Sequence, residues 1–140
     1  MPRIGLLNMV IGFMGVVFAA SGGAFVANDT ARAIFDGTTT ETWLMTLQRS
    51  AHGHTALFGV LHVLFGLTLP YSPLPARLKV WQTVGLSSGL MAMGPLMVWR
   101  SFGTATTDYS AVEVIIGTLL SCALLAIFSH AAGIFLKFLR

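Results

Sequence analysis

The chain has 140 residues, of which 55% are hydrophobic and only 9% are charged, and its mean hydropathy is +0.80. Soluble domains carry about 25% charged residues, so this composition excludes an ordinary soluble globular domain. It indicates an integral membrane protein surrounded by lipid. The net charge of +3 is explained by the Lys and Arg residues that membrane proteins place on their cytoplasmic side. We therefore do not take it as a sign of nucleic-acid binding and expect no nucleic-acid partner.

Four apolar runs are each long enough to cross a bilayer as a helix, which needs about 20 residues. They are Ile4–Ala27, His52–Tyr71, Leu78–Trp99 and Val112–Leu136. No run shows the alternation of apolar and polar residues that is typical of a membrane β-barrel strand. The sequence therefore predicts an all-α fold, a single transmembrane domain built as a four-helix bundle.

Basic residues are concentrated at one end of this predicted bundle. Arg3 precedes the first run, Arg77 and Lys79 separate the second from the third, and Lys137 and Arg140 end the chain. The acidic residues lie in or beside the other two loops. Because cytoplasmic segments are enriched in Lys and Arg, we expect both termini to be cytoplasmic.

The first helix is expected over Ile4–Ala27. Gly15, Ala19 and Gly23 are spaced four residues apart on it, which lets another helix approach that face closely. The following segment, residues 28–40, is rich in turn and capping residues. We predict that it forms an outer loop.

The second helix is expected to begin at Glu41, capped by Thr40, and to enter the membrane near His52. It should end at Pro70, where the chain turns back.

The third and fourth helices each contain a local signal that affects their shape or their start. Pro95 cannot donate a backbone hydrogen bond and should kink the outer part of the third helix. Ser110 and Glu113 have the spacing of a capping box, which predicts the start of the fourth helix.

Three of the four histidines, His52, His54 and His62, lie in the second apolar run. Imidazole at membrane depth serves as a metal or haem ligand, as a proton relay or as a buried hydrogen-bonding group. On a regular helix His52 and His54 point about 160° apart, so they cannot chelate one ion together. His62 lies near the middle of the run, where we expect a buried partner such as Ser87 or Ser88, with a role in a pocket left open.

Below His52, one face of the second helix is formed mainly by small residues: Thr55, Ala56, Gly59, Val63 and Gly66. Such a strip suits either a closely packed helix or the plane of a macrocycle held by an axial histidine. Arg49 lies one turn before His52, where it could meet a haem propionate or a lipid headgroup. His130 lies about 27 Å along the fourth helix, which is too deep to share a haem with His52.

The second run and the residues before it carry a further pattern: Trp43, Arg49, Ala51, His52, Ala56, Leu57, Gly59, Leu69 and Pro70. This pattern resembles the second helix of the styrene oxide isomerases, which are small four-helix membrane proteins of bacteria. The resemblance implies a homotrimer in the bacterial inner membrane, with haem b at each protomer boundary bound by the histidine that matches His52. It also implies that the ferric iron, acting as a Lewis acid, opens a small apolar epoxide to an aldehyde.

The chain departs from that family at three positions. Phe58 stands where the family has a pocket asparagine, and Gly89 and Leu96 stand where it has an acidic residue and a tyrosine. His54 and His62 are additional. Haem binding can carry over without the isomerase activity.

We expect haem b to be bound by residues of the second helix: His52 as the iron ligand, with Arg49, His54, Phe58, Gly59 and His62 as further candidates. Two alternatives stay open. One is a haem protein for electron transfer or gas sensing, in which His54 or His62 of an adjacent chain supplies the sixth ligand. The other is an accessory subunit of a membrane complex without a cofactor.

Overall fold

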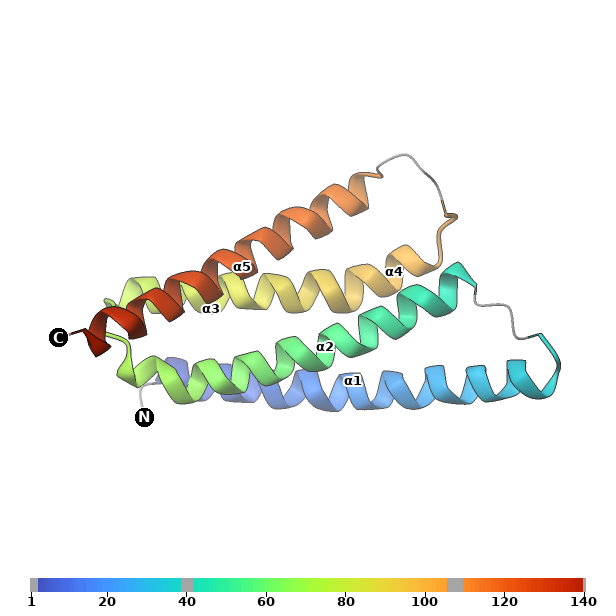
Figure 1. Ribbon diagram of the computed structural model, residues 1–140, viewed down its shortest axis with the longest axis horizontal. Coiled ribbons are helices and arrows are strands. Elements are labelled where there is room, and N and C mark those ends of the chain that lie inside the picture. Colours follow the sequence, from blue (N-terminus) through green and yellow to red (C-terminus); the bar gives the residue numbers. More distant parts are fainter. Residues whose placement is uncertain (1–2, 39–41, 106–109, 140) are drawn as a thin grey trace.

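The computed structural model describes residues 3–38, 42–105 and 110–139, and every regular element in these ranges is helical (Figure 1). The elements form four rods: α1 (Arg3–Phe35); α2 (Trp43–Thr68) with the short turn η1 (Leu69–Tyr71); α3 (Ala76–Met91) continued by η2 (Ala92–Leu96) and α4 (Met97–Ser101); and α5 (Ala111–Phe138). The predicted all-α class is confirmed. Within the described residues, α1, α2 with η1, and α5 are long and apolar enough to cross a membrane.

Helix α1 begins and α5 ends at the same end of the bundle, which also holds the turn between α2 and α3 (Figure 1). We call this the terminal end and the opposite one the loop end. Helix α5 packs on the third rod near the terminal end and diverges from it toward the loop end (Figure 1). The bundle is thus built from two close pairs, α1 with α2 and α3 with α5.

Helix α1 continues to Phe35, about two turns past the end expected at Ala27. The turn-rich composition after Ala27 suggested a loop, but no glycine or proline interrupts the chain before Gly37. Gly37 has a φ of 68°, and the amide after it, that of Thr38, bonds the carbonyl of Ala33 at 2.8 Å. The helix therefore ends at a glycine in the left-handed conformation, and the predicted loop is wrong as far as Phe35.

Helix α2 begins at Trp43. Thr42 is its N-cap, and the Thr42 hydroxyl accepts a hydrogen bond from the backbone amide of Met45 at 3.3 Å. Thr40 and Glu41, where we expected the start, lie outside the described residues.

Two signals were predicted in the second half of the chain, a kink at Pro95 and a capping box; the capping box is confirmed, and the kink stays a prediction. Pro95 lies inside the π-helical turn η2, so the third rod is interrupted where the proline lacks an N–H. At α5 the Ser110 hydroxyl accepts from the amide of Glu113 at 3.3 Å, and the Glu113 carboxylate accepts from the amide of Ser110 at 2.9 Å. Arg100 of α4 donates to the same carboxylate at 2.8 Å, which ties α4 to the start of α5.

Helices α1 and α2 approach each other through glycines. A Cβ atom added to Gly59 would lie 2.9 Å from the carbonyl oxygen of Gly12, and one added to Gly66 would lie 2.6 Å from that of Gly5. Real Cβ atoms do not come so close to a backbone oxygen. Helix α1 therefore covers the small-residue strip below His52 at Gly59 and Gly66. Of the two alternatives for this strip, a closely packed helix or the plane of a macrocycle, these two positions show the packed helix.

We predict that Gly59→Ala lowers the free energy of unfolding by about 1–3 kcal/mol, because the new methyl group forces α1 away from α2. Gly53→Ala is the matched control, since a Cβ at Gly53 meets no atom within 4 Å. In that variant stability should stay equal or rise, because alanine favours a helix over glycine. Denaturant unfolding of both variants in one detergent measures the difference, and equal stabilities would contradict the close contact.

Candidate functional site

The imidazole of His52 is held in a fixed orientation between α1 and α2. Its Nδ1 atom lies 2.7 Å from the backbone carbonyl oxygen of Ala19. A carbonyl can only accept, so Nδ1 carries a proton, and in the neutral imidazole Nε2 then keeps its lone pair. The ring also lies against Gly23, where an added Cβ would overlap Cε1 and would come within 2.8 Å of both ring nitrogens.

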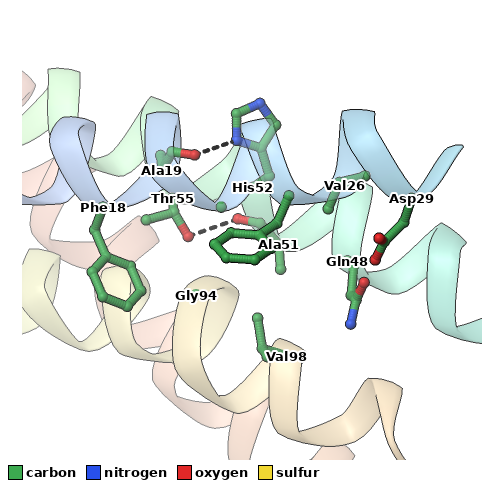
Figure 2. A pocket seen from close by; sticks show the side chains of 12 residues that line it. Phe18, Ala19, Val26, Asp29, Gln48, Ala51, His52, Thr55, Gly94 and Val98 are labelled. Atoms are coloured by element: carbon green, nitrogen blue, oxygen red, sulfur yellow. Dashed lines mark hydrogen bonds between the residues drawn. The ribbon is translucent and has the colours of Figure 1, made fainter. Parts of the chain in front are cut away.

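The second ring nitrogen of His52 points away from the third rod. Figure 2 shows the imidazole turned away from Phe18, Gly94 and Val98, with Nε2 at the far end of the ring. Histidines that bind metals commonly donate their other N–H to a backbone carbonyl in this way. The His52 side chain thus has the tautomer and the direction of an outward-facing ligand.

Gly23 lies against this nitrogen. At about 100° per residue, Ala20 and Ala27 of α1 and Gly53 and Ala56 of α2 lie on the same side of the α1–α2 contact as His52. We call this surface the imidazole face; it consists of Ala20, Gly23, Ala27, Arg49, His52, Gly53 and Ala56. A planar group can approach such a surface closely.

Arg49 lies at the loop end of the imidazole face, one helical turn from His52. Its Nη2 atom donates to the hydroxyl of Thr30 on α1 at 3.3 Å, and that hydroxyl donates to the carbonyl of Val26 at 2.8 Å. The structure therefore brings Arg49 and His52 to the same face. An anionic group beside the imidazole would lie within reach of the guanidinium.

The other predicted site residues lie elsewhere. Phe58 is only 4% exposed and belongs to the hydrophobic core, while Gly59 faces α1. His62 is fully buried, about 15 Å along α2 from His52. His54 donates from Nδ1 to the carbonyl of its own helix at Ser50, at 2.8 Å, on another side of α2.

Two of the three positions at which the chain departs from the isomerase pattern touch each other. A Cβ added to Gly89 would collide with the ring of Phe58 and would lie 2.6 Å from the Cβ of Ala123. The aromatic ring thus fills the space that a side chain at position 89 would need. At positions 58 and 89 this chain therefore has apolar packing, whereas the resemblance implies an asparagine and an acidic residue there.

A buried chain of hydrogen bonds, which we call the polar chain, joins α1, α2 and α3. Asn8 is fully buried, and its Nδ2 atom donates both hydrogens, to the carbonyl of Ile4 at 2.9 Å and to the Thr83 hydroxyl at 2.8 Å. Its Oδ1 atom lies 2.9 Å from Nδ1 of His62, which must therefore donate. The side chains of Asn8, His62 and Thr83 satisfy one another away from water.

Ser87 completes the polar chain by donating to Nε2 of His62 across a long 3.4 Å contact. The expectation of a serine partner on the third helix is thus confirmed, but the shorter bond is to Asn8, which sequence analysis missed. A lone asparagine inside an apolar run is a signal that could have found it.

The fourth histidine lies near the terminal end. The Thr68 hydroxyl donates to the carbonyl of Leu64 at 2.7 Å, so Nε2 of His130 donates to Thr68 across 2.8 Å. The imidazole packs on the ring of Phe65 with centroids 4.3 Å apart. His130 is separated from His52 by most of the length of α2.

Over the part of the chain that the structure describes, no group of three or more His, Cys, Asp or Glu side chains is arranged to hold a metal ion. Haem iron differs, because one axial side chain can bind it. Comparisons of the chain with protein-family models, with curated proteins and with solved structures found no match. The fold and the site define a helical bundle with membrane-length helices, in which the His52 imidazole faces outward in the half of α2 nearer the loop end.

We predict that Asn8→Leu and His62→Leu each lower the free energy of unfolding by about 1–3 kcal/mol, because each leaves a buried polar partner unsatisfied. The double variant should lose less than the sum of the two, with a coupling of about 1 kcal/mol. Denaturant unfolding in detergent measures all three. Pairing Asn8→Leu with Ser121→Ala, an exposed serine that bonds its own helix, should give no coupling. Additive losses for Asn8 and His62 would contradict the bond.

Proposed function

We propose that this chain is a multi-pass protein of a bacterial inner membrane that binds haem b through Nε2 of His52 on the imidazole face. Both termini lie in the cytoplasm, so the imidazole face lies in the outer half of the bilayer. This orientation agrees with the placement of Lys and Arg at the terminal end.

The observation that carries the proposal is the Nδ1–H bond from His52 to the carbonyl of Ala19. It fixes the ring and leaves the other nitrogen unprotonated and directed out of the protomer. Gly23 leaves room for the ring, and Ala20 and Gly53 leave room for a planar group beyond it. Arg49 supplies a cation for a propionate at the loop end.

The position of the imidazole favours an assembly. A haem on the outer surface of one protomer is covered by protein on one side only. A second copy would cover the other side, and a closed ring such as a homotrimer gives every copy the same environment. The imidazole face then lies at the protomer boundary.

The reaction class nearest to this arrangement is the isomerisation of a small apolar epoxide to an aldehyde. Ferric haem held by His52 would supply a Lewis acid for that chemistry. This chain contributes one axial nitrogen and an apolar environment. Phe58 and Gly89 offer no hydrogen bond to orient a substrate, which favours a substrate different from that of the isomerases.

His54 supports a second candidate function, electron transfer or gas sensing. Its Nδ1 atom donates to the Ser50 carbonyl, so its Nε2 is also unprotonated, and it lies at nearly the same depth as His52 on another side of α2. In a ring of copies, His54 of one chain could reach the haem bound by His52 of the next. The iron would then have six ligands and could not act as a Lewis acid.

We predict a Soret band in the purified protein after expression with sufficient haem. His52→Ala should abolish the band because it removes the axial nitrogen, whereas His130→Ala should retain it. Absorption spectra at equal protein concentration measure the occupancy. A protein without the band would leave the cofactor-free accessory subunit as its role.

The same spectra separate the two haem functions. A five-coordinate high-spin spectrum that is unchanged in His54→Ala supports the Lewis acid. A six-coordinate low-spin spectrum that becomes high-spin in His54→Ala supports electron transfer or sensing.

We predict that Gly23→Ala weakens haem binding by about tenfold or more, because the new methyl group occupies the place of the ring and breaks the bond to the Ala19 carbonyl. Gly22→Ala is the matched control, since a Cβ at Gly22 meets no atom within 4 Å. Haem titration of the apoprotein, followed at the Soret maximum, compares the two. Equal haem affinities of the two variants would contradict the position of the His52 ring against Gly23.

A further inference from the structure

A cavity of about 330 Å³ lies on the opposite side of the α1–α2 contact from the imidazole ring. Its walls come from α1, α2, η2 and α4, and Figure 2 shows Phe18 on one side and Val98 on the other. Phe18 and Phe25 are 72% and 74% exposed, so the cavity opens sideways between α1 and α4. In a membrane this opening faces lipid.

The floor of the cavity depends on the irregular turn η2. Gly94 lies in this π-helical turn, and a Cβ there would come within 2.8 Å of the Thr55 hydroxyl oxygen. Thr55 donates its proton to the carbonyl of Ala51 at 2.6 Å, so its oxygen is left as an acceptor. π-Helical turns occur frequently at functional sites because they re-aim the backbone locally.

One end of the cavity is polar. Figure 2 shows the Asp29 carboxylate and the Gln48 amide at the loop end, with apolar side chains along the rest of the wall. A carboxylate and an amide oxygen accept hydrogen bonds, and the aromatic faces of Phe18 and Phe25 attract a cation. The lining therefore matches a cation joined to an apolar body.

We propose that this cavity binds a small amphiphilic amine, with the ammonium group at Asp29 and Gln48 and the apolar body between Phe18 and Val98. A dry cavity of about 150 Å³ can hold a benzene molecule, so this larger one takes a single-ring amine with a short chain. The amine enters from the bilayer. His52 lines this cavity as well as the imidazole face, but the proposed contacts of the amine involve neither its ring nor haem.

Benzylamine and benzyl alcohol test the charge. They have the same apolar body, and isothermal titration of the full chain in a non-ionic detergent should show tighter binding of benzylamine. Asp29→Asn should weaken the binding of benzylamine about threefold to fivefold, which corresponds to the loss of one exposed ion pair. The binding of benzyl alcohol should not change. Asp36→Asn, at an exposed position outside the cavity, should change neither.

Variants that fill the cavity test whether the two ligands bind there. Gly22→Leu adds a side chain where nothing lies within 4 Å, so the fold can accept it, and both ligands should bind about tenfold more weakly or not at all. Gly117→Leu adds the same side chain at an open position on α5 and should bind both ligands normally. Val98→Phe fills the cavity from α4 and replaces Gly22→Leu if that variant does not fold.

Equal affinities for the two ligands, or an effect of Asp36→Asn as large as that of Asp29→Asn, would overturn the role of the carboxylate. Normal binding in both cavity-filling variants would overturn the site.

Discussion

The contact between α1 and α2 determines the rest of the structure. Because Gly12 and Gly59 have no side chains, the two backbones approach until a Cβ on either would strike the other's carbonyl oxygen. This distance lets the carbonyl of Ala19, two turns further along α1, reach Nδ1 of His52. An ordinary apolar interface holds helices about 8–10 Å apart, and side chains would then separate the imidazole from that carbonyl.

Close packing sets the distance between helices, but not how far one slides along the other. The polar chain supplies that register. Asn8 and His62 are both fully buried and bond at 2.9 Å, so a slip of one turn would leave two polar groups unpaired in an apolar interior. The geometry at His52 is therefore fixed by a hydrogen bond about 15 Å away as well as by its own.

Sequence periodicity and local chemistry predicted the helical class and the capping box of Ser110 and drew attention to Pro95, where the helix becomes π-helical, because these signals act within one helix. The extension of α1 to Phe35 was missed because Asn28, Asp29 and Thr30 favour turns in isolation, although they also fit a helix that nothing interrupts.

The candidate site was predictable only in part. Arg49 and His52 share a helix face, so spacing alone was enough to associate them. Whether the glycine strip below His52 faced a helix or a ligand depended on which segment of the chain packs there, and periodicity within one helix carries no such information. For the same reason Phe58, Gly59 and His62 were all named as candidates for one haem site, whereas the structure places them against α3, against α1 and in the polar chain.

The direction of His52 bears on how a cofactor and an assembly would depend on each other. His52 directs one nitrogen out of its own chain, and the imidazole face would cover only one side of a planar group bound there. A neighbouring copy would supply the missing wall, so whatever favours contact between copies would also favour the cofactor. By thermodynamic linkage the cofactor would then stabilise the contact to the same extent. Binding and assembly would form one equilibrium, and small residues along the imidazole face would serve both.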